Sequence, residues 1–194
     1  HPDGVMIGPA LASSNFISTS AERVIAIETG GMFTRFVEER VDKKFKAILI
    51  HTAGQPPRAT RLLIRRLNKE LNLPVYIFTD GDPYGAHIAQ VIISGSANSA
   101  HIPDLATPDA KWLGVWASDI KRYKLPSDKL TDEDIKALNS ILSDHRFSGE
   151  FWKKEIKLQL ELGKKSEQQA LAKYGLNYVT DVYLPERLTE LGII

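Results

Sequence analysis

The sequence predicts an α/β fold: an open parallel sheet flanked by helices and followed by a helical C-terminal extension. Over the first hundred residues, three short apolar runs rich in β-branched and aromatic residues alternate with segments of helical period. After about residue 116, helical patterns dominate. Alternation of this kind is typical of parallel sheets, because each crossover helix returns the chain to the same edge of the sheet.

The predicted strands cover residues 23–28, 45–51 and 73–78, with a further extended segment at 111–116 and a candidate short strand at 100–102. The first strand, Arg-Val-Ile-Ala-Ile-Glu, is apolar on both faces, as expected of a central parallel strand. The residue pattern at Thr131 predicts a capping box that starts a helix. The predicted helices cover residues 32–41, 58–71, 83–94, 131–143, 149–162, 166–173 and 184–191.

Composition limits the class of protein. The chain has 194 residues, of which 43% are hydrophobic and 25% charged, which fits one folded domain. Lys and Arg (25) balance Asp and Glu (24), so any basic surface must be local. The lack of cysteine excludes disulfides and thiolate metal sites, and no apolar run has the length of a membrane span. These features are compatible with a protein of the reducing cytoplasm.

The domain itself is expected to cover residues 23–194. Residues 1–22 show no clear period. We expect them to be a connecting segment that follows an N-terminal domain outside this chain.

Carboxylates follow two of the predicted strands. Glu28 ends the first strand, and Asp80 and Asp82 follow the third in an Asp-Gly-Asp-Pro turn. Ligands of open parallel sheets bind at the carboxyl ends of the strands, and carboxylates there suit a hard cation such as Mg²⁺. Each carboxylate also precedes a helix, so capping is the alternative for any one of them.

Four segments together resemble a known family. They are Ile-Ala-Ile-Glu at 25–28, Gly-Gln-Pro-Pro-Arg-Ala-Thr-Arg at 54–61, Asp-Gly-Asp-Pro-Tyr-Gly at 80–85 and Lys-Trp-Leu-Gly at 111–114. In this order they resemble the Toprim domain of the A subunit of archaeal-type DNA topoisomerase VI, a relative of the meiotic double-strand-break protein. The resemblance extends from about Ser20 to the end of the chain. It implies a Toprim-type, Rossmann-like sheet.

The resemblance also implies a function. Glu28, Asp80 and Asp82 would hold Mg²⁺ for cleavage and religation of double-stranded DNA, with Glu28 and Asp80 on the first ion and Asp82 on a second ion or a bound water. The implied partners are an ATPase B subunit plus a second copy of the A subunit, and the implied location is the cytoplasm, at the nucleoid.

The family's nucleophilic tyrosine lies on a winged-helix domain that precedes the Toprim domain. No winged-helix pattern precedes Glu28, so none of the six tyrosines is carried over as nucleophile, and this chain alone is expected to be inactive.

Other functions remain open from the residues alone. An Asp-x-Asp pair also holds metal diphosphates in nucleotide-sugar transferases, although Glu28 has no role there. Phosphoryl transfer of the haloacid-dehalogenase type needs the aspartate pair on the first strand. A DNA-binding or dimerisation module without catalysis does not account for three carboxylates facing a polyanion.

Several further residues have two interpretations. Arg58, Arg61, Arg65 and Lys69 recur at helical spacing and form a solvated helix face or a surface for DNA phosphates. Tyr84 is expected to pack or form a hydrogen bond beside the site, and His51 to form a hydrogen bond in the core. Trp112 and Trp116 are expected in the core.

Overall fold

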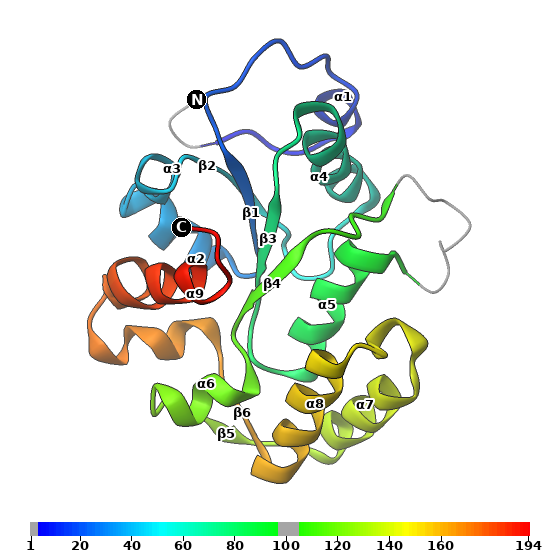
Figure 1. Ribbon diagram of the computed structural model, residues 1–194, viewed down its shortest axis with the longest axis vertical. Coiled ribbons are helices and arrows are strands. Elements are labelled where there is room, and N and C mark those ends of the chain that lie inside the picture. The colour runs from blue at the N-terminus through cyan, green and yellow to red at the C-terminus, as the bar shows by residue number, and fades with distance from the viewer. Residues whose placement is uncertain (1–3, 97–104) are drawn as a thin grey trace.

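A parallel sheet forms the centre of the molecule in the computed structural model, which describes residues 4–96 and 105–194. It has four strands in the order β2-β1-β3-β4, and every neighbouring pair is parallel (Figure 1). The strands are β1 Arg23–Ile27, β2 Ala47–His51, β3 Val75–Phe78 and β4 Lys111–Gly114. The predicted α/β class is confirmed, and β1 and β3, which precede the acidic residues, are direct neighbours.

Helices cover both faces of this sheet. Figure 1 shows α4 and α5 on one side and α2 and α3 on the other. Val24 and Ala26 of β1 pack in the core that includes α4 and α5, whereas Ile25 and Ile27 pack in the core that includes α2 and α3. Successive side chains of a strand point to opposite faces, so a central strand must be apolar throughout. These helices are α2 Gly30–Glu38, α3 Val41–Lys44, α4 Arg58–Leu71 and α5 Pro83–Ser94.

The C-terminal half completes both helical layers. Leu138 of α7 and Ile156 of α8 join the core beneath α4 and α5, and Leu184 and Leu188 of α9 join the core beneath α2. A short antiparallel ribbon, β5 with β6, was not predicted. The elements are α6 Ala117–Arg122, β5 Asp128–Lys129, α7 Asp132–Ser143, the 3₁₀ turn His145–Phe147, α8 Glu150–Leu162, β6 Lys164–Lys165, the 3₁₀ segment η4 Gln168–Tyr174, the π-helical turn Val179–Tyr183 and α9 Leu184–Glu190.

A buried polar network fastens α9 to the sheet. Arg187 is fully buried, pairs with Asp119 of α6, and lies with its Cζ 3.3 Å from the centroid of the Trp116 ring. Tyr183 donates a hydrogen bond of 2.7 Å to Asp119 Oδ2. Trp112 and Trp116 are buried, as predicted.

Several element boundaries differ from the prediction. The helix predicted over 32–41 starts at Gly30, where the Thr29 hydroxyl accepts a hydrogen bond from the amide of Met32, and it ends at Glu38. Arg40 then adopts a left-handed conformation (φ 56°), so α3 is a separate helix. The second strand begins at Ala47 because Lys46 is also left-handed, with φ 48°. The last strand ends at Gly114, and the helix predicted over 166–173 is 3₁₀.

The segment before β1 is also more ordered than predicted. It contains a short helix, α1 Pro9–Ala12. Arg66 of α4 holds this segment, because its Nη1 donates to the carbonyl oxygens of Ala12 (2.7 Å) and Ser14 (2.8 Å) and its guanidinium lies over the Phe16 ring. The candidate strand at 100–102 lies outside the described residues.

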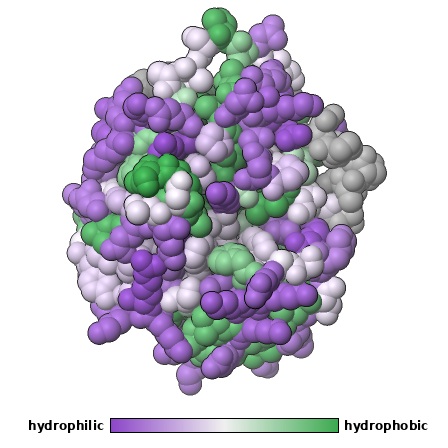
Figure 2. Space-filling view, in the orientation of Figure 1, coloured by the Kyte–Doolittle hydropathy of each residue, from purple (hydrophilic) through white to green (hydrophobic). Residues whose placement is uncertain are grey.

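The surface is mainly polar. On the face shown in Figure 2, hydrophilic side chains dominate and hydrophobic ones form separate patches. Across residues 4–96 and 105–194, no helix combines the length and apolar character needed to cross a membrane.

Candidate functional site

Glu28 and Asp80 meet where β1 and β3 end. The strands pair with Ile27 opposite Phe78, and the amide of Glu28 extends this ladder by donating to the carbonyl oxygen of Phe78 at 3.0 Å. The amide of Asp80 donates to Glu28 Oε2 at 2.8 Å. The structure therefore brings these two predicted site residues into direct contact.

Asp82 lies at the start of α5. Its Oδ1 accepts a hydrogen bond of 2.7 Å from the amide of Gly85, which caps the helix. The tight turn depends on Gly85, because a Cβ there would overlap the carbonyl oxygen of Asp80. Capping, the alternative role considered for the acidic residues, is thus one that Asp82 performs. Together, Glu28, Asp80 and Asp82 form what we call the acidic edge of the sheet.

Backbone amides satisfy only part of the carboxylates. One oxygen of each is held: Glu28 Oε2 by Asp80, Asp80 Oδ1 by the amide of Gln168 at 2.8 Å, and Asp82 Oδ1 by Gly85. Glu28 Oε1 and Asp80 Oδ2 form no hydrogen bond with the described residues. Within those residues, no three His, Asp or Glu side chains are grouped as a metal site. The local arrangement is a pair of carboxylates with free oxygens and a third carboxylate beside them.

Burial dominates the electrostatics of this site. Desolvation raises the pKa of Glu28 to about 7, and the negative charges of Asp80 and Asp82 add to this effect, against the hydrogen bond from the amide of Asp80. Desolvation likewise raises the pKa of Asp80 to about 6, with Asp82 and Glu167 contributing in the same direction. Both carboxylates are therefore costly to ionise without a compensating cation.

A lysine balances part of the charge on Asp82. Desolvation raises the pKa of Asp82, the Gly85 amide and the positive charge of Lys165 lower it, and Asp134 raises it. Lys165 Nζ lies 2.6 Å from Asp134 Oδ2. Sequence reasoning treated Lys165 as solvated, but its ammonium acts on the acidic edge.

Residues of the C-terminal half hold the acidic turn from the other side. The amide of Gly81 donates to the carbonyl oxygen of Ser166 at 2.7 Å, and Gln159 Nε2 donates to the carbonyl oxygen of Gly81 at 2.7 Å. Gln159, Ser166 and Gln168 were missed by sequence reasoning. No local pattern could have found them, because these contacts join residues more than 70 positions apart along the chain.

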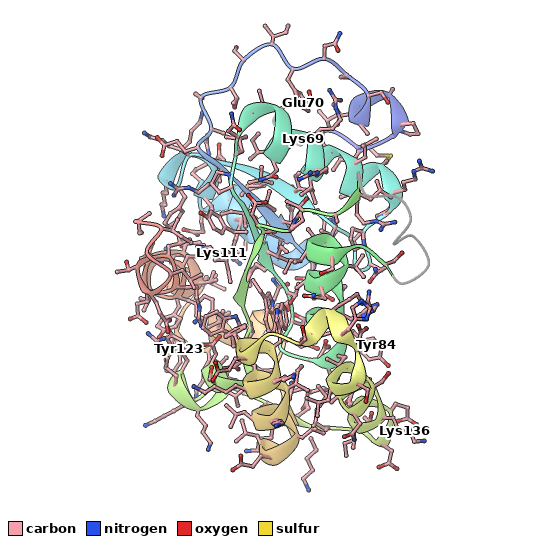
Figure 3. The ribbon with its side chains drawn as sticks, turned by 45° about the vertical axis from the view of Figure 1, so that its right-hand side comes forward. Lys69, Glu70, Tyr84, Lys111, Tyr123 and Lys136 are labelled. Carbon is pink, nitrogen blue, oxygen red and sulfur yellow. The ribbon has the colours of Figure 1, made fainter. Side chains whose placement is uncertain are left out.

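Tyr84 and His51 differ from the predictions. Tyr84 is 58% exposed at the start of α5 and makes no hydrogen bond through its hydroxyl with the described residues (Figure 3). Packing holds it weakly because it extends from the first turn of the helix. His51 is half-buried and stacks on Phe33, with ring centroids 5.6 Å apart, and no hydrogen bond to it occurs among the described residues.

The basic stripe follows α4 away from the acidic edge. Arg58 and Lys69 are exposed, while Arg61 and Arg65 are half-buried. Figure 3 shows Lys69 at the far end of α4 from Tyr84, which is close to Asp82 in the sequence. The stripe is thus closest to the acidic edge at Arg58, and contact with DNA phosphates stays a prediction.

Comparison with known proteins identifies the family. The family model for the Toprim domain of Spo11 and the topoisomerase 6 A subunit matches residues 23–188. The chain belongs to this Toprim family. The match covers the whole sheet and the C-terminal helices, including the Asp119–Arg187 network, and it confirms the resemblance found in the sequence. The acidic edge of this Toprim domain is therefore the place where β1 and β3 of the family fold end.

Similar proteins are archaeal. This Toprim domain is 63% identical over 180 residues to the A subunit of type 2 DNA topoisomerase 6 from Archaeoglobus fulgidus, covering 92% of the chain and 50% of that protein. It is 57% identical over 186 residues to the protein of the same name from Methanothermobacter thermautotrophicus, covering 95% and 53%. The chain thus spans about half the length of the curated relatives it matches.

Proposed function

We propose that this Toprim domain is the Mg²⁺-binding part of a type II DNA topoisomerase. It takes part in cleavage and religation of double-stranded DNA within the A subunit, with Glu28, Asp80 and Asp82 as its site residues. The observation that carries the proposal is the contact between the amide of Asp80 and Glu28 Oε2, which holds two carboxylates side by side at the end of the sheet.

The donor set fits Mg²⁺. This ion prefers oxygen ligands, retains several waters and needs only one or two carboxylates from a protein. Glu28 Oε1 and Asp80 Oδ2, which form no hydrogen bond with the described residues, suit the first ion. Asp82 is held as a helix cap, so it serves through water or with a second ion. Bound Mg²⁺ supplies stabilisation of the negative charge that develops on phosphodiester oxygens.

The chain's own residues orient and neutralise. The sheet and the amides of Asp80 and Gln168 hold the carboxylates in fixed directions, which lowers the reorganisation needed when an ion and a phosphate arrive. The attacking tyrosine belongs to a part of the protein outside this chain. Tyr84, although exposed close to Asp82, has no base within hydrogen-bond reach of its hydroxyl among the described residues.

The proposed partners follow from the names of the relatives. They are double-stranded DNA, a second copy of the A subunit to cut the opposite strand, and an ATPase B subunit. The complex acts in the cytoplasm at the nucleoid. A nucleotide-sugar or phosphoryl transferase is less well supported, because the Glu28–Asp80 contact has no role in those reactions.

Calorimetric titration with Mn²⁺ tests the metal site. We expect wild type to bind at least one ion, and Glu28→Gln and Asp80→Asn to lose that binding. Asp128→Asn is a matched control, because Asp128 is an exposed carboxylate on β5 away from β1 and β3. Equal binding by wild type and Asp80→Asn contradicts the proposal.

In the reassembled full-length enzyme, Glu28→Gln and Asp80→Asn are expected to abolish DNA cleavage nearly completely. DNA binding by these variants separates a defect in chemistry from a defect in assembly. Normal cleavage by either variant contradicts the assigned roles.

A further inference from the structure

We propose that Gln168 is a positioning residue that joins the two loops carrying Glu28 and Asp80 and sets the spacing of their carboxylates. This inference rests on the proposed metal site. It concerns a residue in the C-terminal half, on η4, that no motif in the sequence singles out.

Gln168 makes three contacts at the acidic edge. Its Nε2 donates to the carbonyl oxygen of Phe78 at 2.9 Å, its Oε1 accepts from the hydroxyl of Thr29 at 2.8 Å, and its backbone amide donates to Asp80 Oδ1 at 2.8 Å. Thr29 directly follows Glu28, and Phe78 lies two residues before Asp80. One side chain therefore bridges the β1 loop and the β3 loop, while its own backbone holds the Asp80 carboxylate.

The surroundings make this bridge rigid. Gln168 is fully buried, and the neighbouring η4 residue Leu171 is fully buried in the core beneath α2. A buried amide whose oxygen and nitrogen are both bonded has little freedom to rotate, and breaking either bond would leave a buried polar group unsatisfied.

The bridge acts where the sheet no longer can. The ladder between β1 and β3 ends with the amide of Glu28 on the carbonyl oxygen of Phe78, and this same oxygen accepts from Gln168. Beyond that point, the Thr29 loop is tied to β3 through Gln168. Because groups that orient the ligands of a metal contribute strongly to its affinity, loss of the bridge is expected to weaken ion binding by about tenfold.

Calorimetric titration of this chain with Mn²⁺ tests the bridge. Gln168→Met removes the amide but keeps a side chain of similar length, and it is expected to weaken Mn²⁺ binding by about tenfold. Thr29→Val removes the other end of the bridge and is expected to act in the same direction. Thr29→Ser retains the hydroxyl and is expected to bind as wild type does.

Gln90→Met is the matched control. Gln90 is also a buried glutamine whose Nε2 donates to a backbone carbonyl, that of Arg146, but it lies on α5 away from the carboxylates. We expect Gln90→Met to lower the metal-free melting temperature as Gln168→Met does, and to leave Mn²⁺ affinity unchanged.

The outcomes separate this inference from the proposed function. A wild type that binds no Mn²⁺ contradicts the metal site itself. If wild type binds and Gln168→Met binds equally tightly, the bridge has no positioning role. If Gln90→Met weakens binding as much as Gln168→Met, general destabilisation explains the effect and the inference is wrong. Should Gln168→Met fail to fold, the comparison of Thr29→Val with Thr29→Ser decides, and equal affinities overturn the bridge.

Discussion

The amide of Asp80 donates a hydrogen bond to Glu28 Oε2 across 2.8 Å, and this bond joins the end of β3 to the end of β1. It stabilises one carboxylate oxygen with a neutral donor and adds no positive charge. The negative charges of the neighbouring Asp residues still act on Glu28 and help to raise its pKa to about 7. The site is thus held in shape by backbone hydrogen bonds and remains short of positive charge.

The two aspartates are expected to differ in their contribution to metal binding. Asn is as good a helix cap as Asp, so Asp82→Asn keeps α5 capped and leaves first-ion affinity largely intact. Asp80→Asn removes a carboxylate with a free oxygen and loses this affinity. Mn²⁺ titration of both variants measures the difference. If Asp82→Asn loses binding while Asp80→Asn keeps it, the roles are reversed.

Stability without metal is expected to fall as pH rises. Burial raises the pKa of Glu28 from 4.5 to about 7, so between these values the folded state holds a proton that the unfolded state has released. The free energy of unfolding therefore decreases from about pH 4.5 to pH 7 through this group. Urea unfolding of wild type and Glu28→Gln in chelator measures it as the difference between the two. A difference that is constant with pH contradicts the assignment.

Gly85→Ala is expected to destabilise the protein strongly. The added methyl group meets the carbonyl oxygen of Asp80, which is backbone and cannot rotate away, so a cost of about 1–3 kcal/mol or more is expected. Gly31→Ala in α2 is the control, because its Cβ meets only the flexible side chain of Gln169. Chemical denaturation of both variants gives the free energies. Similar stabilities would show that α5 can shift freely.

Arg187→Met is expected to cost about 3–5 kcal/mol of unfolding free energy, because it leaves the buried carboxylate of Asp119 without its cation. The positive charge of Arg187 lowers the pKa of Asp119 against desolvation, so this pKa is expected to rise in the variant. Asp119→Asn combined with Arg187→Met is expected to recover part of the loss. Equilibrium unfolding of the single and double variants tests the pairing, and full additivity contradicts it.

Tyr84→Phe is expected to leave DNA cleavage by the reassembled enzyme unchanged. Its hydroxyl has no hydrogen-bond partner among the described residues, and the side chain is 58% exposed. This chain alone is expected neither to relax supercoiled DNA nor to form a covalent adduct. Mapping a 5′-linked adduct to any of its tyrosines by mass spectrometry would overturn the proposal that the nucleophile lies elsewhere.

Local patterns predicted the elements that surround the site. The bounds of α4 and α5 agree with the prediction, because Pro57 and Pro83 mark their starts and helical spacing of apolar residues continues to their ends. The division of the predicted helix 32–41 was missed, because the left-handed conformation of Arg40 has no signal in its neighbours.

The sequence by itself determined the α/β class, the family and the three acidic residues at strand ends, since strand and helix periods and turn residues act over short distances. Only the tertiary structure decided that β1 lies beside β3, that Asp80 and Glu28 touch, and that Gln159, Ser166 and Gln168 hold the acidic turn. These contacts join residues far apart along the chain. They arise from packing of the C-terminal half against the sheet, which no local pattern of residues encodes.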